Sequence, residues 1–193
     1  MTSMILATRN AHKLIEVRRI LGDDRVGALP DDVELGPEIG ETFAENALAK
    51  ARTASAATAI AAIADDSGIC ADALGGAPGV RSARFAGERA SDEQNLALLI
   101  ERVPAGSALA YVCAIAYVDR ELELERIFEG RCEGRMAQQP RGSGGFGYDP
   151  VFVPDEGRGA TMAELDPAQK DAISHRGRAL RHFAQWLDGG GDG

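Results

Sequence analysis

The chain has 193 residues, 45% of them apolar and 26% charged, which is ordinary for one globular domain with a sizeable core. Its formal net charge of -9 argues against a large nucleic-acid interface, because such an interface requires a basic surface. No apolar run approaches the roughly 18 to 20 residues that cross a bilayer, and Met1 to Asn10 do not resemble a secretion signal. We therefore expect a cytoplasmic protein that binds neither nucleic acid nor a membrane.

Cysteine and lysine are both sparse. The three cysteines lie far apart, so they indicate buried thiols in a reducing compartment rather than a zinc site or a disulfide set. Only three of the 21 basic residues are lysines: Lys13, Lys50 and Lys170. In a chain so rich in arginine, a lysine is favoured where a compact ammonium is needed, although chance also explains the bias.

The first part of the chain alternates strands with helices. An apolar run at 4–8 predicts a strand, and apolar residues at helical spacing after Asn10 predict a helix. The turn between such elements commonly holds ligands in α/β proteins. Thr42 and Glu45 have the spacing of a capping box, which predicts a second helix that runs through the alanine-rich stretch 47–59.

A buried strand is predicted next, at 59–64, and we expect it to stop at the acidic pair Asp65-Asp66. A second capping box predicts a helix that begins near Ser91 and is ended by Pro104. These elements place the acidic pair at the end of a strand.

The later part of the chain contains a predicted β-hairpin, in which 109–118 and 122–128 flank a polar tip. The first arm is almost entirely apolar, whereas the second alternates, as central and edge strands do. A short strand at 151–153 follows. A short helix that begins at Asp166 then precedes a last helix with one apolar face.

The acidic pair is the strongest chemical signal. Adjacent carboxylates at a strand end point in different directions, so that one can bind a metal ion while the other accepts a proton. The alternative is that Asp65, Asp66, Ser67 and Gly68 only form a turn, since these residue types are ordinary in turns.

Three glutamates before the second helix offer a further carboxylate for a metal site. Glu38, Glu41 or Glu45 would complete an oxygen-only set suited to a hard cation such as Mg²⁺. Glu45 also fits the role of the capping partner, and Glu41 that of a solvated acid in the first helical turn.

The turn Thr8–Lys13 joins the first strand to a helix. Its backbone N–H groups and Lys13 have the arrangement that binds phosphates at a helix N-terminus. A plain turn with a surface lysine is the alternative.

A glycine-rich segment, 142–147, matches G-x-G-x-x-G, but a strand and not a helix follows it, so the context rejects a dinucleotide-binding loop. It is better interpreted as a loop that approaches a ligand closely, with Phe146 stacking on a base and Asp149 orienting polar groups. A mere glycine linker is the alternative.

Ser174-His175-Arg176-Gly177 opens the last helix. His175 and Arg176 are suited to contact a purine oxygen or a phosphate, although an N-cap serine with solvated neighbours has the same pattern. No Walker A sequence, G-x-S-x-G elbow or metal-binding histidine pair occurs, which disfavours serine or cysteine nucleophile chemistry.

Taken in order, these motifs resemble the inosine triphosphate pyrophosphatase family over nearly the whole chain. The segments that carry the resemblance are ATRNAHK, ETFAENALAKA, IADDSG, LGGAPGVRSARFAG, GGFGYDPVF and KDAISHRGRAL. The resemblance implies hydrolysis of ITP, dITP and XTP to the monophosphate and pyrophosphate, which removes deaminated purine nucleotides from the pool.

The resemblance also implies the site. Mg²⁺ is expected on Glu38 and Asp66, with Asp65 and Glu41 as alternative ligands, and Asp66 is expected to accept the proton of the attacking water. The implied substrate-binding residues are Thr8, Arg9, Asn10, Lys13, Lys50, Ser67, Phe146, Gly147, Tyr148, Asp149, Lys170, His175 and Arg176. Arg9 and His12 depart from the small residues that many members have there.

The predicted elements give an α/β fold with a mixed sheet, in one domain at 1–188 that is followed by a disordered tail at 189–193. The resemblance implies an elongated, two-lobed version with a long mixed sheet, flanking helices and an active site in the cleft between the lobes. It also implies a homodimer, for which the apolar loop 74–80 is an interface candidate.

Two other functions stay open. A pyrimidine triphosphate pyrophosphatase of the Maf-like type shares the phosphate chemistry, although the GGFGYD and SHR segments favour a purine. A nucleotide-binding module without turnover would lack an acid, yet Asp65, Asp66 and Glu38 are all present. An NAD-linked oxidoreductase rests only on the glycine match.

Overall fold

A computed structural model describes residues 4–22 and 24–190. The strands and helices are β1 (Met4–Leu6), α1 (Ala11–Leu21), β2 (Val26–Ala28), α2 (Phe43–Thr58), β3 (Ala62–Ala71), α3 (Asp92–Arg102), β4 (Ala108–Asp119), β5 (Leu124–Met136), β6 (Phe152–Pro154), α4 (Pro167–Ile173) and α5 (His175–Asp188). Among these described residues, no helix combines the length and apolar character that crossing a membrane requires.

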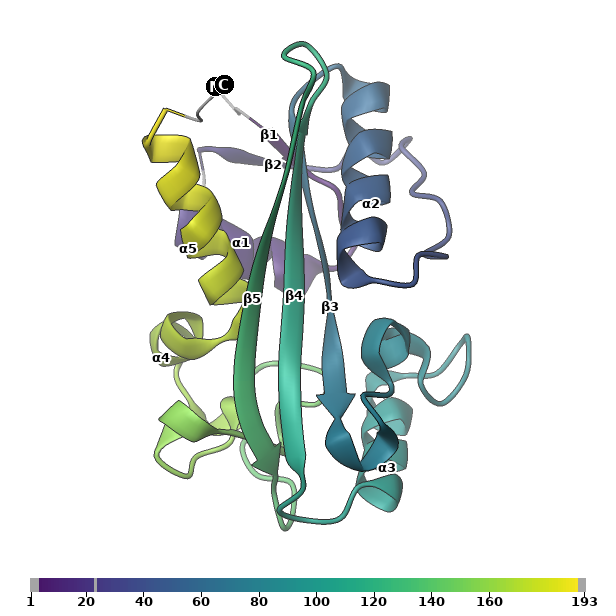
Figure 1. Ribbon diagram of the computed structural model, residues 1–193, viewed down its shortest axis with the longest axis vertical. Helices are drawn as coiled ribbons and strands as arrows, with labels where there is room; N and C mark the ends of the chain where they lie inside the picture. Colours follow the sequence, from purple (N-terminus) through teal and green to yellow (C-terminus); the bar gives the residue numbers. More distant parts are fainter. Residues whose placement is uncertain (1–3, 23, 191–193) are drawn as a thin grey trace. The chain divides into compact units, whose positions relative to one another are not determined.

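The strands form one six-stranded sheet in the order β2-β1-β3-β4-β5-β6 (Figure 1). β1 runs parallel to both β2 and β3, with Met4 opposite Val26 and Ile5 opposite Ala62. β6 runs antiparallel to the end of β5, with Gly134 opposite Pro154. The sheet is therefore mixed, which confirms the α/β fold expected from the sequence.

Contacts divide the chain into two compact units, which we call the first and the second unit. The first contains the described residues of Met1–Asp66, Cys113–Gly130 and Arg176–Gly193, and the second contains Ser67–Val112 and Arg131–His175. Strands β3, β4 and β5 each contribute residues to both. The expectation of one domain at 1–188 stays a prediction. α5 ends at Asp188, directly before the expected tail, and residues 191–193 of that tail lie outside the described residues.

The first unit has an apolar core on each face of its sheet. Successive side chains of a strand point to opposite faces, so Ile63 of β3 joins the core formed with α1 and α5, while Ala62 and Ala64 join the core formed with α2. The α2 core is built mainly from alanines, which lets the helix lie close to the sheet. Leu180 and Phe183 of α5 are fully buried in the other core.

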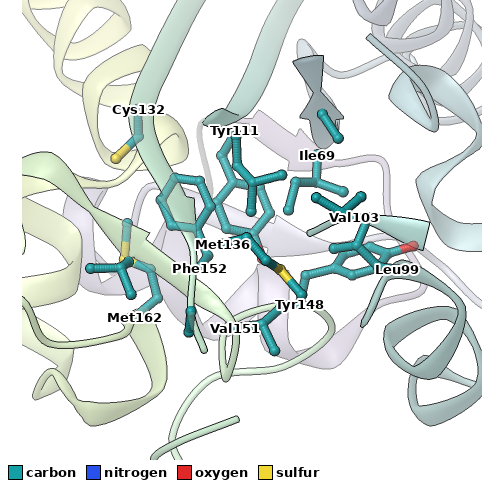
Figure 2. Packing of buried hydrophobic residues seen from close by; sticks show 14 residues of the cluster. Ile69, Leu99, Val103, Tyr111, Cys132, Met136, Tyr148, Val151, Phe152 and Met162 are labelled. Atoms are coloured by element: carbon teal, nitrogen blue, oxygen red, sulfur yellow. The ribbon is translucent and has the colours of Figure 1, made fainter. Parts of the chain in front are cut away.

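The second unit has a core of its own, drawn in Figure 2. Leu99 of α3 and Phe152 of β6 are fully buried there, and Tyr111 of β4 packs its ring against Phe152 with centroids 4.5 Å apart. Larger aromatic and aliphatic side chains thus fill this core, in contrast to the alanines beside α2.

The predicted end of the third strand is wrong. β3 does not stop at Asp65-Asp66 but continues through both residues to Ala71. Period-2 alternation still sends the two carboxylates to opposite faces, as the sequence interpretation required. The strand tolerates them because cationic side chains from neighbouring helices meet each one, which no local pattern reveals.

Other boundaries follow the sequence more closely. The capping boxes at α2 and α3 are confirmed, with Thr42 and Ser91 as N-caps. The predicted hairpin arms become β4 and β5, although β5 runs on to Met136 because it pairs with β6 there. β2 was not expected, since three residues of mixed character carry little signal before β1 provides a partner.

Ala59 ends α2 in the left-handed conformation, with φ 55°, and this position suits glycine better than alanine. We expect Ala59→Gly to raise the free energy of unfolding by roughly 0.5–1 kcal/mol, because the Cβ strain disappears. Ala56→Gly, in the exposed helical part of α2, is the matched control and should lower it by roughly 0.5–1 kcal/mol. Urea denaturation measures both, and equal signs for the two variants would contradict the strain at Ala59.

Candidate functional site

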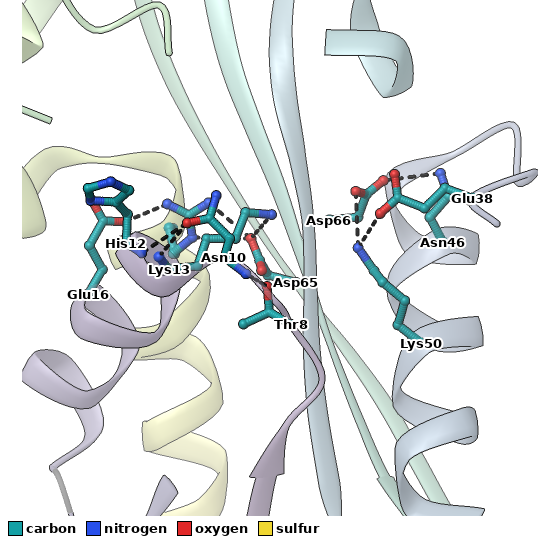
Figure 3. A network of polar contacts seen from close by, with 11 residues as sticks. Thr8, Asn10, His12, Lys13, Glu16, Glu38, Asn46, Lys50, Asp65 and Asp66 are labelled. Carbon is teal, nitrogen blue, oxygen red and sulfur yellow. Dashed lines mark hydrogen bonds and ion pairs between the residues drawn. The ribbon is translucent and has the colours of Figure 1, made fainter. Parts of the chain in front are cut away.

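β3 holds two adjacent buried aspartates whose side chains lie on opposite sides of the strand (Figure 3). Asp65 is 1% exposed and Asp66 is 5% exposed. Burying a carboxylate is costly unless hydrogen bonds and an opposite charge compensate for the lost water. The first unit supplies a different set of partners to each of the two.

Asp65 lies in a buried ion cluster on the α1 and α5 side of the strand. Its Oδ2 is 3.0 Å from Lys13 Nζ and 3.0 Å from Arg176 Nη2. Arg176, which is 2% exposed, also donates from Nη1 to Glu16 Oε2 at 2.5 Å. Two carboxylates and two cations therefore neutralise one another in this cluster.

The charges around Asp65 keep it ionised. Burial is the largest single effect and raises its pKa, but the positive charges of Lys13, Arg176 and Lys50 together outweigh burial and hold the pKa well below the ordinary aspartate value. The pKa of the Arg176 guanidinium is raised, because Asp65 and Glu16 outweigh the effect of its burial. Asp65 is thus suited to anchor cations and not to accept a proton.

Asp66 faces α2 and the loop that precedes it. Lys50 Nζ is 2.7 Å from Glu38 Oε1 and 3.3 Å from Asp66 Oδ1. Asn46 donates from Nδ2 to Asp66 Oδ2 at 3.1 Å. Asn46 and Lys50 are four residues apart on α2, so one face of the helix presents both to the strand.

Asp66 differs from its neighbour in acidity. Burial is the largest cause that raises its pKa, and the nearby charge of Glu38 raises it further. Lys50, Lys13 and the hydrogen bond from Asn46 act in the opposite direction without cancelling this rise. A carboxylate with a raised pKa is a better proton acceptor than an ordinary one near neutral pH, so Asp66 has the property of a general base.

The loop before α2 is held where it carries Glu38. Gly40 donates its N–H to Asn46 Oδ1 at 2.8 Å, and a Cβ at Gly40 would lie 2.7 Å from that same oxygen. Only glycine fits this approach, and it ties the loop to the helix that bears Lys50. Glu41, the rival metal ligand, has an exposed side chain, and its N–H donates to Glu45 Oε2.

The turn between β1 and α1 uses its own side chains as caps. Asn10 Oδ1 accepts from the N–H groups of His12 and Lys13, at 2.9 and 3.3 Å. Thr8 Oγ1 accepts from the N–H of Asn10 at 3.1 Å. Three backbone donors at this helix N-terminus, those of Asn10, His12 and Lys13, are therefore engaged with internal acceptors.

Arg9 turns away from that helix end. Its guanidinium donates to the backbone carbonyls of Leu29, Pro30 and Val33, at 3.2, 2.8 and 2.6 Å. This arginine ties the β1–α1 turn to the segment after β2. Arg9 stands where many family members have a small residue, and here its side chain makes a structural contact between two loops.

The second unit contains a separate buried polar cluster around Asp149. Its Oδ2 accepts from Lys170 Nζ at 2.7 Å and from the N–H of Phe146 at 3.0 Å, and its Oδ1 accepts from Tyr111 Oη at 3.1 Å. Lys170 Nζ also lies 4.9 Å from the centre of the Phe146 ring. His175 stacks on the Tyr111 ring, with centroids 4.5 Å apart.

The glycine-rich segment fits tightly around this cluster. Gly145 has φ 70°, and a Cβ there would lie 1.9 Å from Asp149 Oδ2. Gly147 also has a positive φ, of 60°. Tyr148 is buried and donates its hydroxyl to the Ser82 carbonyl at 2.6 Å, which is a contact within the protein. Ser67, also in this unit, is half-buried in β3.

Sequence reasoning did not single out three residues that hold the clusters together: Glu16, Asn46 and Tyr111. Asn46 lies one turn before Lys50 on α2, and Glu16 lies about one turn after Lys13 on α1, so helical spacing was a usable signal for both. Tyr111 carries a lone hydroxyl in an apolar strand, and only the fold provides its partner.

The carboxylates of Glu38 and Asp66 fit a magnesium site better than a closed protein cage. Among residues 4–22 and 24–190, no group of three or more His, Cys, Asp or Glu side chains is arranged to hold a metal ion. Mg²⁺ is usually held by one or two carboxylates together with waters and substrate phosphates. Two carboxylates that converge on one cation position, now held by Lys50, match that pattern.

Comparison with known proteins identifies relatives along the whole chain. A model of the Ham1 family matches residues 4–186. A curated relative, the dITP/XTP pyrophosphatase of Mycolicibacterium paratuberculosis, is 50% identical and is aligned over 97% of each chain. This likeness confirms the family resemblance found in the sequence motifs.

Solved structures support the same grouping. A HAM1 protein from Coxiella burnetii is 39% identical with a TM-score of 0.86, covering 98% of this chain and 100% of that one. The Staphylococcus aureus Ham1 protein is 34% identical with a TM-score of 0.84, covering 97% and 98%. Because the family model and these relatives span almost the whole length, the chain belongs to the Ham1 family.

Proposed function

We propose that this protein hydrolyses deaminated purine nucleoside triphosphates, namely ITP, dITP and XTP, to the monophosphate and pyrophosphate. The observation that carries the proposal is Asp66, a buried carboxylate of raised pKa beside Glu38 and Lys50. The relative of this protein from Mycolicibacterium paratuberculosis bears the name dITP/XTP pyrophosphatase. That name favours a purine over a pyrimidine substrate.

We propose Glu38 and Asp66 as the residues that hold Mg²⁺. When bound, the ion would neutralise charge on the phosphates and orient them for an in-line attack. The convergence of both carboxylates on Lys50 Nζ supports this assignment over Glu41, whose side chain is exposed. Asp65 is the less suitable ligand, because Lys13 and Arg176 already engage it.

The chain's own residues supply the remaining chemistry. Asp66 accepts a proton from water as the water oxygen bonds to the α-phosphorus and the bond to the pyrophosphate oxygen breaks. Lys13 and Lys50 stabilise the charge that builds on the phosphate oxygens. Both ammonium groups are paired with carboxylates, so a triphosphate would compete with those carboxylates for them.

We assign recognition of the base to residues of the second unit. Phe146 offers an aromatic face, and Asp149, Lys170 and His175 offer hydrogen-bonding groups held by a shared network. A 6-oxo purine accepts a hydrogen bond where adenine carries an amino donor. A site built around that bond can discriminate by roughly 10⁴ or more, because the wrong base leaves buried groups unpaired.

We further infer that the protein acts in the cytoplasm as a homodimer, as its family resemblance implies. Sedimentation equilibrium of the purified chain measures the oligomeric state, and substitutions in the loop 74–80 test whether that loop forms the interface.

The direct test is hydrolysis of ITP, dITP and XTP beside ATP, GTP and UTP, with Mg²⁺ and with EDTA. Chromatography must separate monophosphate and pyrophosphate from diphosphate and phosphate. We expect Mg²⁺-dependent release of IMP and pyrophosphate from ITP, with ATP and GTP nearly inert. If only UTP is consumed, the protein is a pyrimidine triphosphate pyrophosphatase instead. If every nucleotide survives, the result supports a nucleotide-binding module without turnover.

Asp66→Asn should lower kcat for ITP by roughly 10² to 10⁴, because the amide cannot accept the proton. The amide nearly matches the carboxylate in shape, so affinity for a non-hydrolysable analogue such as α,β-imido-ITP should stay within about tenfold, since one charge of the proposed metal site is lost. Asp72→Asn, at an exposed position just beyond the same strand, is the control and should retain activity. A kcat near that of the wild type in Asp66→Asn would overturn the proton-accepting role.

Glu38→Gln and Glu41→Gln separate the two candidate metal ligands. We expect Glu38→Gln to raise the Mg²⁺ concentration for half-maximal activity about tenfold or more, because a charged ligand is lost. Glu41→Gln removes an exposed charge three residues away and should leave that concentration nearly unchanged. Activity titrated with MgCl₂ at saturating ITP measures both, and the reverse order would reassign the ligand to Glu41.

A further inference from the structure

Lys50 occupies the point at which the two proposed metal ligands converge. Its Nζ is 2.7 Å from Glu38 Oε1 and 3.3 Å from Asp66 Oδ1, and its side chain is 10% exposed. The ammonium is thus the counter-charge for both carboxylates. Figure 3 shows it reaching from α2 toward both of them.

A metal ion and this ammonium compete for the same oxygens. Mg²⁺ binds carboxylate oxygens at about 2.0–2.1 Å, so an ion held by both groups would overlap with an ammonium at the observed position. Charge repulsion between the two cations adds to the overlap. Lys50 would have to leave these two oxygens before a metal ion could use Glu38 Oε1 and Asp66 Oδ1 together.

A third carboxylate, besides Glu38 and Asp66, lies within electrostatic range of Lys50. Asp65 is near enough to influence Lys50, but Lys13 and Arg176 bond its Oδ2. A phosphate group is an alternative acceptor for a flexible ammonium, which makes one compact contact where arginine would need a planar fork. Departure of Lys50 is therefore favourable when a phosphate arrives together with the metal.

We propose that Lys50 blocks the metal-binding carboxylates in the nucleotide-free protein and is transferred to a substrate phosphate, so that metal and nucleoside triphosphate bind cooperatively. This inference rests on the proposed function, since it takes Glu38 and Asp66 as the metal ligands. Its consequence is that the metal binds weakly alone and tightly with the nucleotide. By thermodynamic linkage, the metal strengthens nucleotide binding by the same factor.

The test measures Mn²⁺ binding to the full chain by electron paramagnetic resonance, without nucleotide and with α,β-imido-ITP. Lys50→Met keeps the length of the side chain and removes its charge. We expect it to bind Mn²⁺ alone on the order of tenfold more tightly than the wild type, because the competing cation is gone. The factor by which the analogue strengthens Mn²⁺ binding should fall by a similar amount.

Lys13→Met is the matched control. It removes an ammonium in the same unit that pairs with Asp65 instead of with Glu38 and Asp66. Mn²⁺ binding in the absence of nucleotide should change by less than about threefold in this variant, since Lys13 bonds neither proposed ligand and acts on Asp66 only through space. Lys50→Arg retains the charge and should keep Mn²⁺ binding weak. Lys50→Gln, neutral and polar, replaces Lys50→Met if circular dichroism shows that the latter is unfolded.

Each outcome decides the proposal separately from the proposed function. Tighter Mn²⁺ binding in the neutral Lys50 variants, but not in Lys13→Met, supports it. Equal or weaker Mn²⁺ binding in the neutral variants, while the wild type hydrolyses ITP, overturns the role of Lys50 and leaves the function intact. If Mn²⁺ binding tightened equally in Lys13→Met, the effect would come from the loss of any nearby positive charge. That result would also overturn the proposal. A wild-type protein that leaves ITP intact refutes the function itself.

Discussion

Two carboxylates on consecutive residues of a buried strand can stay in the protein only if each meets a cation. Asp65 and Asp66 are 1% and 5% exposed, so water stabilises neither of them fully. The strand sends them to opposite faces, which obliges the elements on both faces of the sheet to supply positive charge. α1 and α5 supply Lys13 and Arg176 on one side, and α2 supplies Lys50 on the other. The basic residues of these helices meet that requirement.

The two aspartates end in different chemical states because their surroundings differ. Asp65 has two directly bonded cations, which hold its pKa low and make it a permanent anchor. Asp66 shares one ammonium with Glu38, and burial beside a second acid raises its pKa. One strand thus carries two neighbouring carboxylates whose pKa values are shifted in opposite directions. Surroundings that separate the pKa values of two nearby acids suit the two acids to different acid–base roles.

In the second unit, a single buried carboxylate is likewise compensated by hydrogen bonds and a cation. Asp149 accepts hydrogen bonds from Lys170, Tyr111 and the N–H of Phe146, so a fixed network holds its carboxylate. Glycine at 145 is required because a side chain would collide with that carboxylate. The glycine-rich segment is therefore shaped around a polar group of the protein. Tyr111 links this cluster to His175 through its ring.

The sequence by itself determined the local elements and the chemistry available to them. Capping boxes fixed where α2 and α3 begin, alternation put Asp65 and Asp66 on opposite sides, and the motifs identified the family. Tertiary structure alone decided that β3 continues through the acidic pair, that Arg9 bonds four backbone carbonyls between 29 and 33, and that Lys50 joins Glu38 to Asp66. The reason is that strand length and the fate of a buried charge depend on partners distant in the chain, whereas caps and periodicity depend on residues within one turn of each other.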